Sequence, residues 1–250
     1  MRERQSSYTE EELLRYLVED TTKEKLYSLY NEYYVGQKSI SVKNTKIRQY
    51  DFIAKFLLSI DDNLEEFFNR NIPVIQRTPR DRDNGKTYKV VGHNPQNEKK
   101  EALTRQKPLD EEWLAKSLLL ENFDHIGEII DYQIPLNEKD ADGAGNVDLL
   151  AYNKQTKRLS LIELKREDNQ ETMLRAILEI STYFCQIDRK TLKEDFSGYP
   201  SSNEEPQKVV LVFKDSKQHQ QYNESQYIKE LAKKLNVIVL LLDNKCIITP

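Results

Sequence analysis

The sequence predicts an α/β domain whose sheet is covered by helices on both faces, preceded by a mainly helical region. After residue 107, short apolar segments alternate with helical patterns in the order helix, three strands, helix, strand, helix, strand. Several segments, such as residues 208–213, are almost continuously apolar, which is typical of strands buried on both faces. We therefore divide the chain into residues 1–107, a mainly helical N-terminal region ending in a basic hairpin or loop, and residues 108–250, the α/β domain.

Composition indicates a globular protein without a membrane segment. Of the 250 residues, 38% are hydrophobic and 32% are charged, and the net charge of −4 does not indicate a nucleic-acid partner. The chain starts without an apolar signal region, and no apolar run approaches the roughly 20 residues that span a bilayer. The two cysteines, Cys185 and Cys246, lack metal-ligand spacing and lie in apolar surroundings. We expect a cytoplasmic protein with no membrane partner.

The N-terminal region shows repeated helical patterns. Thr9 and Glu12 have the spacing of a capping box, which predicts that a helix begins there. Further helices are expected at residues 22–34 and 45–59, where apolar side chains recur at helical spacing, and a short one around Leu64. We expect their aromatic side chains to form a helical core.

The chain becomes basic between residues 76 and 107. Nine lysines and arginines occur there against four acids, and Asn84-Gly85 lies between two short apolar runs. Asn-Gly favours a tight turn because both residues tolerate a positive φ, so a basic hairpin is expected. Such a hairpin could lie on a phosphate backbone, and a solvated loop without a specific role is the alternative. The candidate nucleic-acid-binding residues are Arg77, Arg80, Arg82, Lys86 and Lys89.

The second part of the chain contains the elements of the α/β domain. Asp110 is a candidate N-cap for a helix at residues 111–122. Later helices are expected at residues 171–187 and 222–235. Strands are expected at residues 128–135, 147–152, 159–165, 208–213 and 237–242, and residues 137–146 are expected to form a loop.

The strand pair that begins at residue 147 carries an unusual set of charges. A hairpin whose turn is centred at residues 155–156 places Asp148 directly opposite Glu163, with Lys165 on the same face as Glu163. Opposed carboxylates repel each other and destabilise an otherwise apolar hairpin unless a positive charge lies between them. A divalent cation between them would supply that charge, and a structural ion pair between Lys165 and one acid is the alternative.

This arrangement resembles the PD-(D/E)XK, or restriction-endonuclease-like, superfamily of phosphodiesterases over residues 108–213. Asp148 matches the family's first metal-binding aspartate, and Glu163-Leu164-Lys165 matches its E-x-K element. The resemblance implies a mixed sheet flanked by helices. It also implies Mg²⁺, or Mn²⁺ in its place, held by Asp148, Glu163 and the backbone carbonyl of Leu164. Lys165 would then orient a water molecule or stabilise the transition state.

Other positions match the family with differences. Glu179 and Tyr183 resemble the Q-x-x-x-Y helix motif of the recombination and repair branch, with a glutamate in place of the amide. Val147 stands where proline is common. The first helix of this family often supplies a further acid, for which Glu112 is the candidate and Glu128 the competing choice.

The resemblance implies a metal-dependent nuclease that hydrolyses phosphodiester bonds of DNA in repair, restriction or phage defence. The candidate catalytic residues are Asp148, Glu163, Lys165, Glu112, Glu179 and Tyr183. Two other classes stay open: a catalytically silent nucleic-acid-binding or protein-interaction module on the same fold, and an interaction protein whose helical N-terminal half is the working part. DNA and RNA, endonuclease and exonuclease, and monomer and homodimer are not distinguished by the sequence.

Overall fold

A seven-stranded mixed sheet forms the centre of the protein. The computed structural model describes residues 39–42, 45–60, 63–66, 88–89, 92–105, 110–136, 146–243 and 246–248. The sheet has the strand order β3-β4-β5-β6-β7-β8-β9, in which β6, β7 and β8 are parallel neighbours and the other neighbouring pairs are antiparallel. The strands are β3 (Asn122–Phe123), β4 (Gly127–Pro135), β5 (Asn146–Asn153), β6 (Arg158–Lys165), β7 (Gln207–Phe213), β8 (Val237–Asp243) and β9 (Cys246–Ile248).

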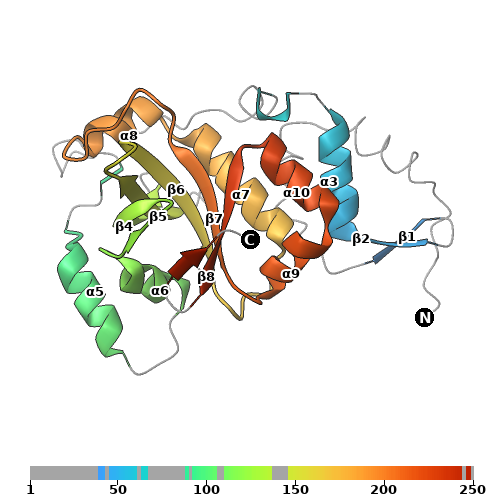
Figure 1. The fold of residues 1–250 in the computed structure, drawn as a ribbon, viewed down its shortest axis with the longest axis horizontal. Helices are drawn as coiled ribbons and strands as arrows, with labels where there is room; N and C mark the ends of the chain where they lie inside the picture. The colour runs from blue at the N-terminus through green and yellow to red at the C-terminus, as the bar shows by residue number, and fades with distance from the viewer. Residues whose placement is uncertain are drawn as a thin grey trace.

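Helices cover both faces of this sheet, as the sequence predicts (Figure 1). One buried apolar cluster joins α7 (Met173–Gln186) and α10 (Gln226–Lys234) to the sheet, and a second cluster joins α6 (Glu111–Leu118) to it. The shorter helices α8 (Arg189–Asp195) and α9 (Lys217–Glu224) precede and follow β7. An α/β fold with a mixed sheet flanked by helices is therefore confirmed. In the described ranges, none of the helices is long and apolar enough to cross a membrane.

Side-chain caps determine where several helices begin. Asp110 accepts a hydrogen bond from a backbone N–H of the first turn of α6, as its sequence position predicts. Thr172 caps α7 in the same way. Ser225 caps α10 and separates it from α9, so the single helix expected at residues 222–235 is in fact two helices. A serine in a helical pattern thus marks a break because its hydroxyl competes for backbone groups.

α6 is shorter than the sequence predicts. The expected helix extends to residue 122, but α6 ends at Leu118, and Leu120 has a φ of +62°, which does not continue a right-handed helix. A turn then connects β3 to β4. β4 begins at Gly127, whose φ is +80°. A Cβ at Gly127 would lie 2.2 Å from the carbonyl oxygen of Tyr152, so only glycine fits there.

The described part of the N-terminal region begins with strands. β1 (Ser39–Val42) and β2 (Thr45–Arg48) form an antiparallel hairpin, and α3 (Gln49–Ile60) starts after it. The prediction of a helix at residues 45–59 was therefore wrong for residues 45–48, which form β2. α3 packs against α10, and its buried side chains share one core with α7, so residues on both sides of position 107 contribute to the same core. The helices expected near residue 9 and at residues 22–34 lie outside the described residues.

A further helix, α5 (Pro95–Thr104), occupies part of the stretch expected to be a basic hairpin or loop. The side chain of Asn94 accepts a hydrogen bond from the N–H of Asn97, and Pro95 stands at the first helical position. Both are recognised signals for a helix start. α5 packs against α6, and the Asn84-Gly85 turn lies outside the described residues.

Candidate active site

The hairpin of β5 and β6 brings Asp148 and Glu163 together. Leu149 pairs with Ile162, and the same register continued by one residue sets Asp148 opposite Glu163, as predicted. The turn is fixed by Asn153, whose side chain accepts two backbone hydrogen bonds. Both carboxyls lie on the sheet face that α7 covers, because the residues two positions along each strand belong to the cluster on that face.

Neighbouring strands orient the Asp148 carboxylate. Its Oδ2 accepts a hydrogen bond from the N–H of Leu164 at 2.8 Å, and its Oδ1 accepts one from Nε2 of Gln133 on β4 at 3.3 Å. Gln133 in turn accepts a hydrogen bond from the side chain of Asn146 at 3.1 Å. Only 6% of Asp148 and 3% of Glu163 are exposed. The two carboxyls are therefore held in fixed positions and largely removed from water.

Lys165 lies at the centre of a cluster of acids. Its Nζ is 2.6 Å from Oε1 of Glu163, 2.8 Å from Oε2 of Glu171 and 3.2 Å from Oε2 of Glu179, and its side chain is 4% exposed. One amine therefore contacts three acidic side chains, rather than the single acid of the simplest structural alternative. We call Asp148, Glu163, Lys165, Glu171 and Glu179 the carboxylate cluster.

α7 contributes one face of this cluster. The Tyr183 hydroxyl donates a hydrogen bond to Oε1 of Glu179 at 3.2 Å, and Nε of Arg175 lies 3.5 Å from Oε2 of Glu179. These residues are spaced four apart, so they share one side of the helix. The structure thus brings Glu179 and Tyr183 together with the residues of the β5–β6 hairpin.

The first-turn acid of α6 that approaches the cluster is Glu111, one residue before the expected Glu112. The Glu112 side chain is 52% exposed, and its Oε1 lies 2.8 Å from Nζ of Lys116 on the same helix. Glu111 is close enough for its charge to act on the buried aspartate and lysine. Glu128, the competing choice, pairs with Lys154 at 3.2 Å. Side chains of successive helical residues point about 100° apart, so Glu111 and Glu112 extend in different directions from α6.

Two residues near Lys165 were not among the candidates. Glu171 and Arg175 form an ion pair of 3.2 Å between Oε1 and Nε. Glu171 lies on the loop between β6 and α7, which Gln218 of α9 fixes by donating hydrogen bonds to the backbone oxygens of Asn169 and Glu171 at 3.0 and 2.9 Å. The spacing of four residues from Glu171 to Arg175, and again to Glu179, is the sequence signal that could identify them.

Burial and the charges of neighbouring acids raise the pKa of both strand carboxyls. Burial, followed by the charge on Glu111, raises the pKa of Asp148 to about 8, although Lys165 opposes the shift. Burial, followed by the charge on Asp148, raises the pKa of Glu163 well above its ordinary value. Asp148 therefore keeps its proton near neutral pH, because a buried carboxyl next to other acids is disfavoured in its charged form.

Lys165 and Glu179 are held in their charged forms. Burial opposes the charge of Lys165, but Glu163 and Glu179 outweigh it and raise the pKa of the amine well above its ordinary value. Burial also opposes the charge of Glu179, but Lys165 and Arg175 outweigh it and lower the pKa of that carboxyl. A lysine that keeps its proton acts as a fixed positive charge and not as a general base.

The two strand carboxyls offer oxygen atoms to a divalent cation. Oε2 of Glu163 is buried and receives no hydrogen bond from a nitrogen or hydroxyl donor of the described residues. Mg²⁺ commonly binds one or two carboxylates and keeps several waters, and Asp148 with Glu163 meets that requirement. In the part of the chain that the structure describes, no three acidic, histidine or cysteine side chains form a group that could hold a metal ion. Lys165 occupies the cluster as the competing cation.

Most of the candidate nucleic-acid-binding residues lie outside the described residues, namely Arg77, Arg80, Arg82 and Lys86. Lys89 is described and exposed. The adjacent Tyr88 is buried; its N–H donates to Oδ2 of Asp195, and its hydroxyl accepts from the N–H of Asp188, both at 2.8 Å. These contacts hold Lys89 at the surface beside α8, and nucleic-acid binding by this stretch stays a prediction.

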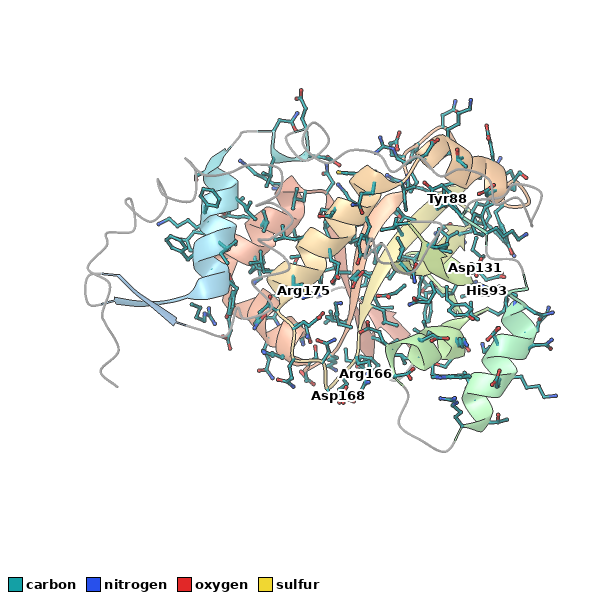
Figure 2. The ribbon with its side chains drawn as sticks, turned by 180° about the vertical axis from the view of Figure 1, so that it is seen from behind. Tyr88, His93, Asp131, Arg166, Asp168 and Arg175 are labelled. Carbon is teal, nitrogen blue, oxygen red and sulfur yellow. The ribbon has the colours of Figure 1, made fainter. Side chains whose placement is uncertain are left out.

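Another polar contact joins the segment before α5 to β4. Nδ1 of His93 is 2.9 Å from Oδ1 of the buried Asp131, and the imidazole ring stacks on Tyr132 with 4.3 Å between ring centres. Figure 2 shows His93 and Asp131 well apart from Arg166 and Asp168, which lie on the loop that follows β6. The His93 pair is therefore separate from the loop that carries Glu171.

Comparison with known proteins gives no relative from which a function could be transferred. No family model matches the chain, and no curated protein or solved structure matches it. The function therefore has to be inferred from the chemistry of the carboxylate cluster.

Proposed function

We propose that this protein is a metal-dependent nuclease that hydrolyses phosphodiester bonds of DNA, with an active site of the PD-(D/E)XK type. The observation that carries the proposal is the set of Asp148, Glu163 and Lys165, which share one buried end of the β5–β6 hairpin. Buried carboxyls with raised pKa values, next to a specific charged partner, are more common at functional sites than elsewhere.

In this proposal, Asp148 and Glu163 hold the cation, together with the backbone carbonyl of Leu164. Mg²⁺ or Mn²⁺, when bound, would act as a Lewis acid that lowers the pKa of a water molecule and offsets the negative charge of the phosphate. Lys165 keeps its proton, so its role is to stabilise negative charge on the phosphate. Glu179, with Tyr183 and Arg175, positions the lysine.

A catalytically silent module on the same fold is the alternative. It is favoured by the three ion pairs of Lys165, which satisfy the amine within the protein. Buried charges of this kind can be purely structural. The two functions differ in whether a divalent cation binds at Asp148 and whether DNA is cleaved.

The test is cleavage of supercoiled plasmid, linear duplex and single-stranded DNA by the full chain, with Mg²⁺, Mn²⁺ or EDTA. Asp148→Asn and Glu163→Gln keep the shape of each side chain and remove its charge. Glu167→Gln is the matched control, because Glu167 is exposed on the loop that follows β6. Cation-dependent thermal shifts are measured on the same proteins, since a ligand that binds only the folded state raises its melting temperature.

We expect cleavage with either cation and none in EDTA, a loss of cleavage in both site variants, and full cleavage in Glu167→Gln. The cation should raise the melting temperature of the wild type and of Glu167→Gln but not that of Asp148→Asn. If Asp148→Asn retains full cleavage or retains the cation-dependent shift, the active site is not at this hairpin. A folded wild type that cleaves none of the substrates and shows no cation shift would favour the silent module.

A further inference from the structure

A cavity of about 650 Å³ opens at the end of the sheet opposite to Lys165. Its lining includes Arg158 and Gln207, the first residues of β6 and β7. Lys165 is the last of the eight residues of β6, and strand residues rise about 3.3 Å each, so the two ends of this strand are roughly 23 Å apart. The cavity is therefore a different site from the carboxylate cluster.

Basic side chains dominate the walls of this cavity. They come from four separate elements, β6, α8, β7 and α10, and outnumber the acids that line it. The lining cations are Arg158, Arg189, Lys208 and Lys233, and the lining acids are Glu65 and Glu205. A concave surface with an excess of one charge attracts ligands of the opposite charge.

Two of the cations are fixed in place before any ligand binds. The Lys208 side chain is 4% exposed, and its Nζ lies 2.6 Å from Oε1 of Glu65 and 4.7 Å from the centre of the Phe184 ring. The guanidinium carbon of Arg189 lies 4.8 Å from the same ring centre. Asn236 donates a hydrogen bond to the other oxygen of Glu65. A preorganised charge of this kind loses little side-chain entropy when a ligand binds.

Three of the four cations can be reached by a ligand, namely Lys233, Arg158 and Arg189. Lys233 is exposed and has no ion-pair partner in the described part of the chain. Arg158 and Arg189 pair with the exposed carboxylates of Glu204 at 3.5 Å and Glu205 at 2.9 Å. Exposed ion pairs contribute little to stability, so an anion with more charge can replace them.

Apolar side chains line part of the cavity. They are Phe184, Pro206, Val237 and Ile238, and Ile238 is 37% exposed, which makes it one of the few exposed large hydrophobic residues of the described chain. A ligand with a ring and a charged group could cover Ile238 and reach the cations together. Arginine side chains match the oxygen geometry of phosphate, and the volume lies in the range of small-molecule sites.

We infer that this cavity binds a nucleoside phosphate, with its phosphate oxygens among Arg158, Arg189 and Lys233 and its ring against Ile238. The inference is independent of the proposed nuclease activity, because it concerns the other end of the sheet and needs neither metal nor turnover.

The test is isothermal titration calorimetry of the full chain in EDTA with ATP, AMP, pyrophosphate and adenosine, and with a short oligonucleotide. Lys233→Gln removes a cation that lines the cavity. Lys190→Gln removes a cation of α8 that does not line the cavity. The Lys190 side chain follows Arg189 in sequence and is 86% exposed. Both variants change the net charge equally, so they separate a local contact from a general charge effect.

We expect ATP to bind more tightly than AMP or pyrophosphate, and adenosine to bind weakest. Loss of one charge-assisted hydrogen bond should weaken ATP binding about tenfold in Lys233→Gln, with little change in Lys190→Gln. The inference is overturned if no nucleotide binds at millimolar concentration or if both variants weaken binding equally. It is also overturned if only the oligonucleotide binds and Lys233→Gln weakens it, because the cavity would then take phosphates of a polynucleotide.

Discussion

Asp148→Asn should stabilise the protein without metal, and the gain should grow with pH. The pKa of Asp148 is about 8 in the folded protein, against an ordinary value of 3.8. Between these values the folded chain keeps a proton that the unfolded chain has released. The free energy of unfolding of the wild type therefore falls as the pH rises through this window. Asparagine does not titrate, so the variant lacks this contribution.

The size of the effect follows from the same two pKa values. Each pKa unit between 3.8 and the working pH corresponds to about 1.4 kcal/mol, which gives an upper bound of about 4 kcal/mol at pH 7 and about 2 kcal/mol at pH 5. Rearrangement of the neighbouring side chains around the charge reduces both values. We expect Asp148→Asn to exceed the wild type by about 2 kcal/mol at pH 7 and by less than about 1 kcal/mol at pH 5.

Urea unfolding in EDTA at the two pH values measures this difference. Asparagine can still accept the hydrogen bond from the N–H of Leu164, although it loses the 3.3 Å hydrogen bond from Nε2 of Gln133. Asp168→Asn is the control, because the Asp168 side chain is 71% exposed and pairs with Arg166, and its loss should change stability by less than about 0.5 kcal/mol at either pH. A gain that is the same at pH 5 and pH 7, or a variant less stable than the wild type, would refute the raised pKa of Asp148.

Two further substitutions test the cluster and the fold. In EDTA at pH 8, Lys165→Ala should lower the free energy of unfolding by about 3 kcal/mol, because Glu163, Glu171 and Glu179 lose their shared cation. Urea unfolding should show a smaller loss at pH 5, where protons replace the amine, and equal losses would contradict this reasoning. Gly127→Ala should cost about 3 kcal/mol or more because its Cβ would overlap the Tyr152 carbonyl; an unchanged melting temperature in a thermal scan would show that the turn relaxes.

The sequence by itself determined the features that depend on residues close together in the chain, such as strand register and helix caps. The register of β5 and β6 follows from the turn and from the alternation of strand side chains, so the opposition of Asp148 and Glu163 could be predicted. The start of α6 follows from Asp110, a local cap. The cover of helices on both faces follows from the nearly continuous apolar strands.

Some local signals were present but outweighed by a longer pattern. Asn94 and Pro95 mark the start of α5 within a stretch whose charges suggested a basic hairpin or loop. Ser225 marks a helix break that apolar periodicity alone does not reveal. In both places the hydrogen bond of one side chain to the backbone decides the boundary.

Only the tertiary structure decided which acids surround Lys165. The rotation of α6 selects Glu111 over Glu112, and the docking of α9 on the loop after β6 brings in Glu171. The basic cavity likewise combines residues from Glu65 to Lys233, far apart in the chain. Sequence periodicity specifies which face of a helix is buried, but the direction of each side chain depends on how packed surfaces fit together, and that fit involves residues distant in sequence.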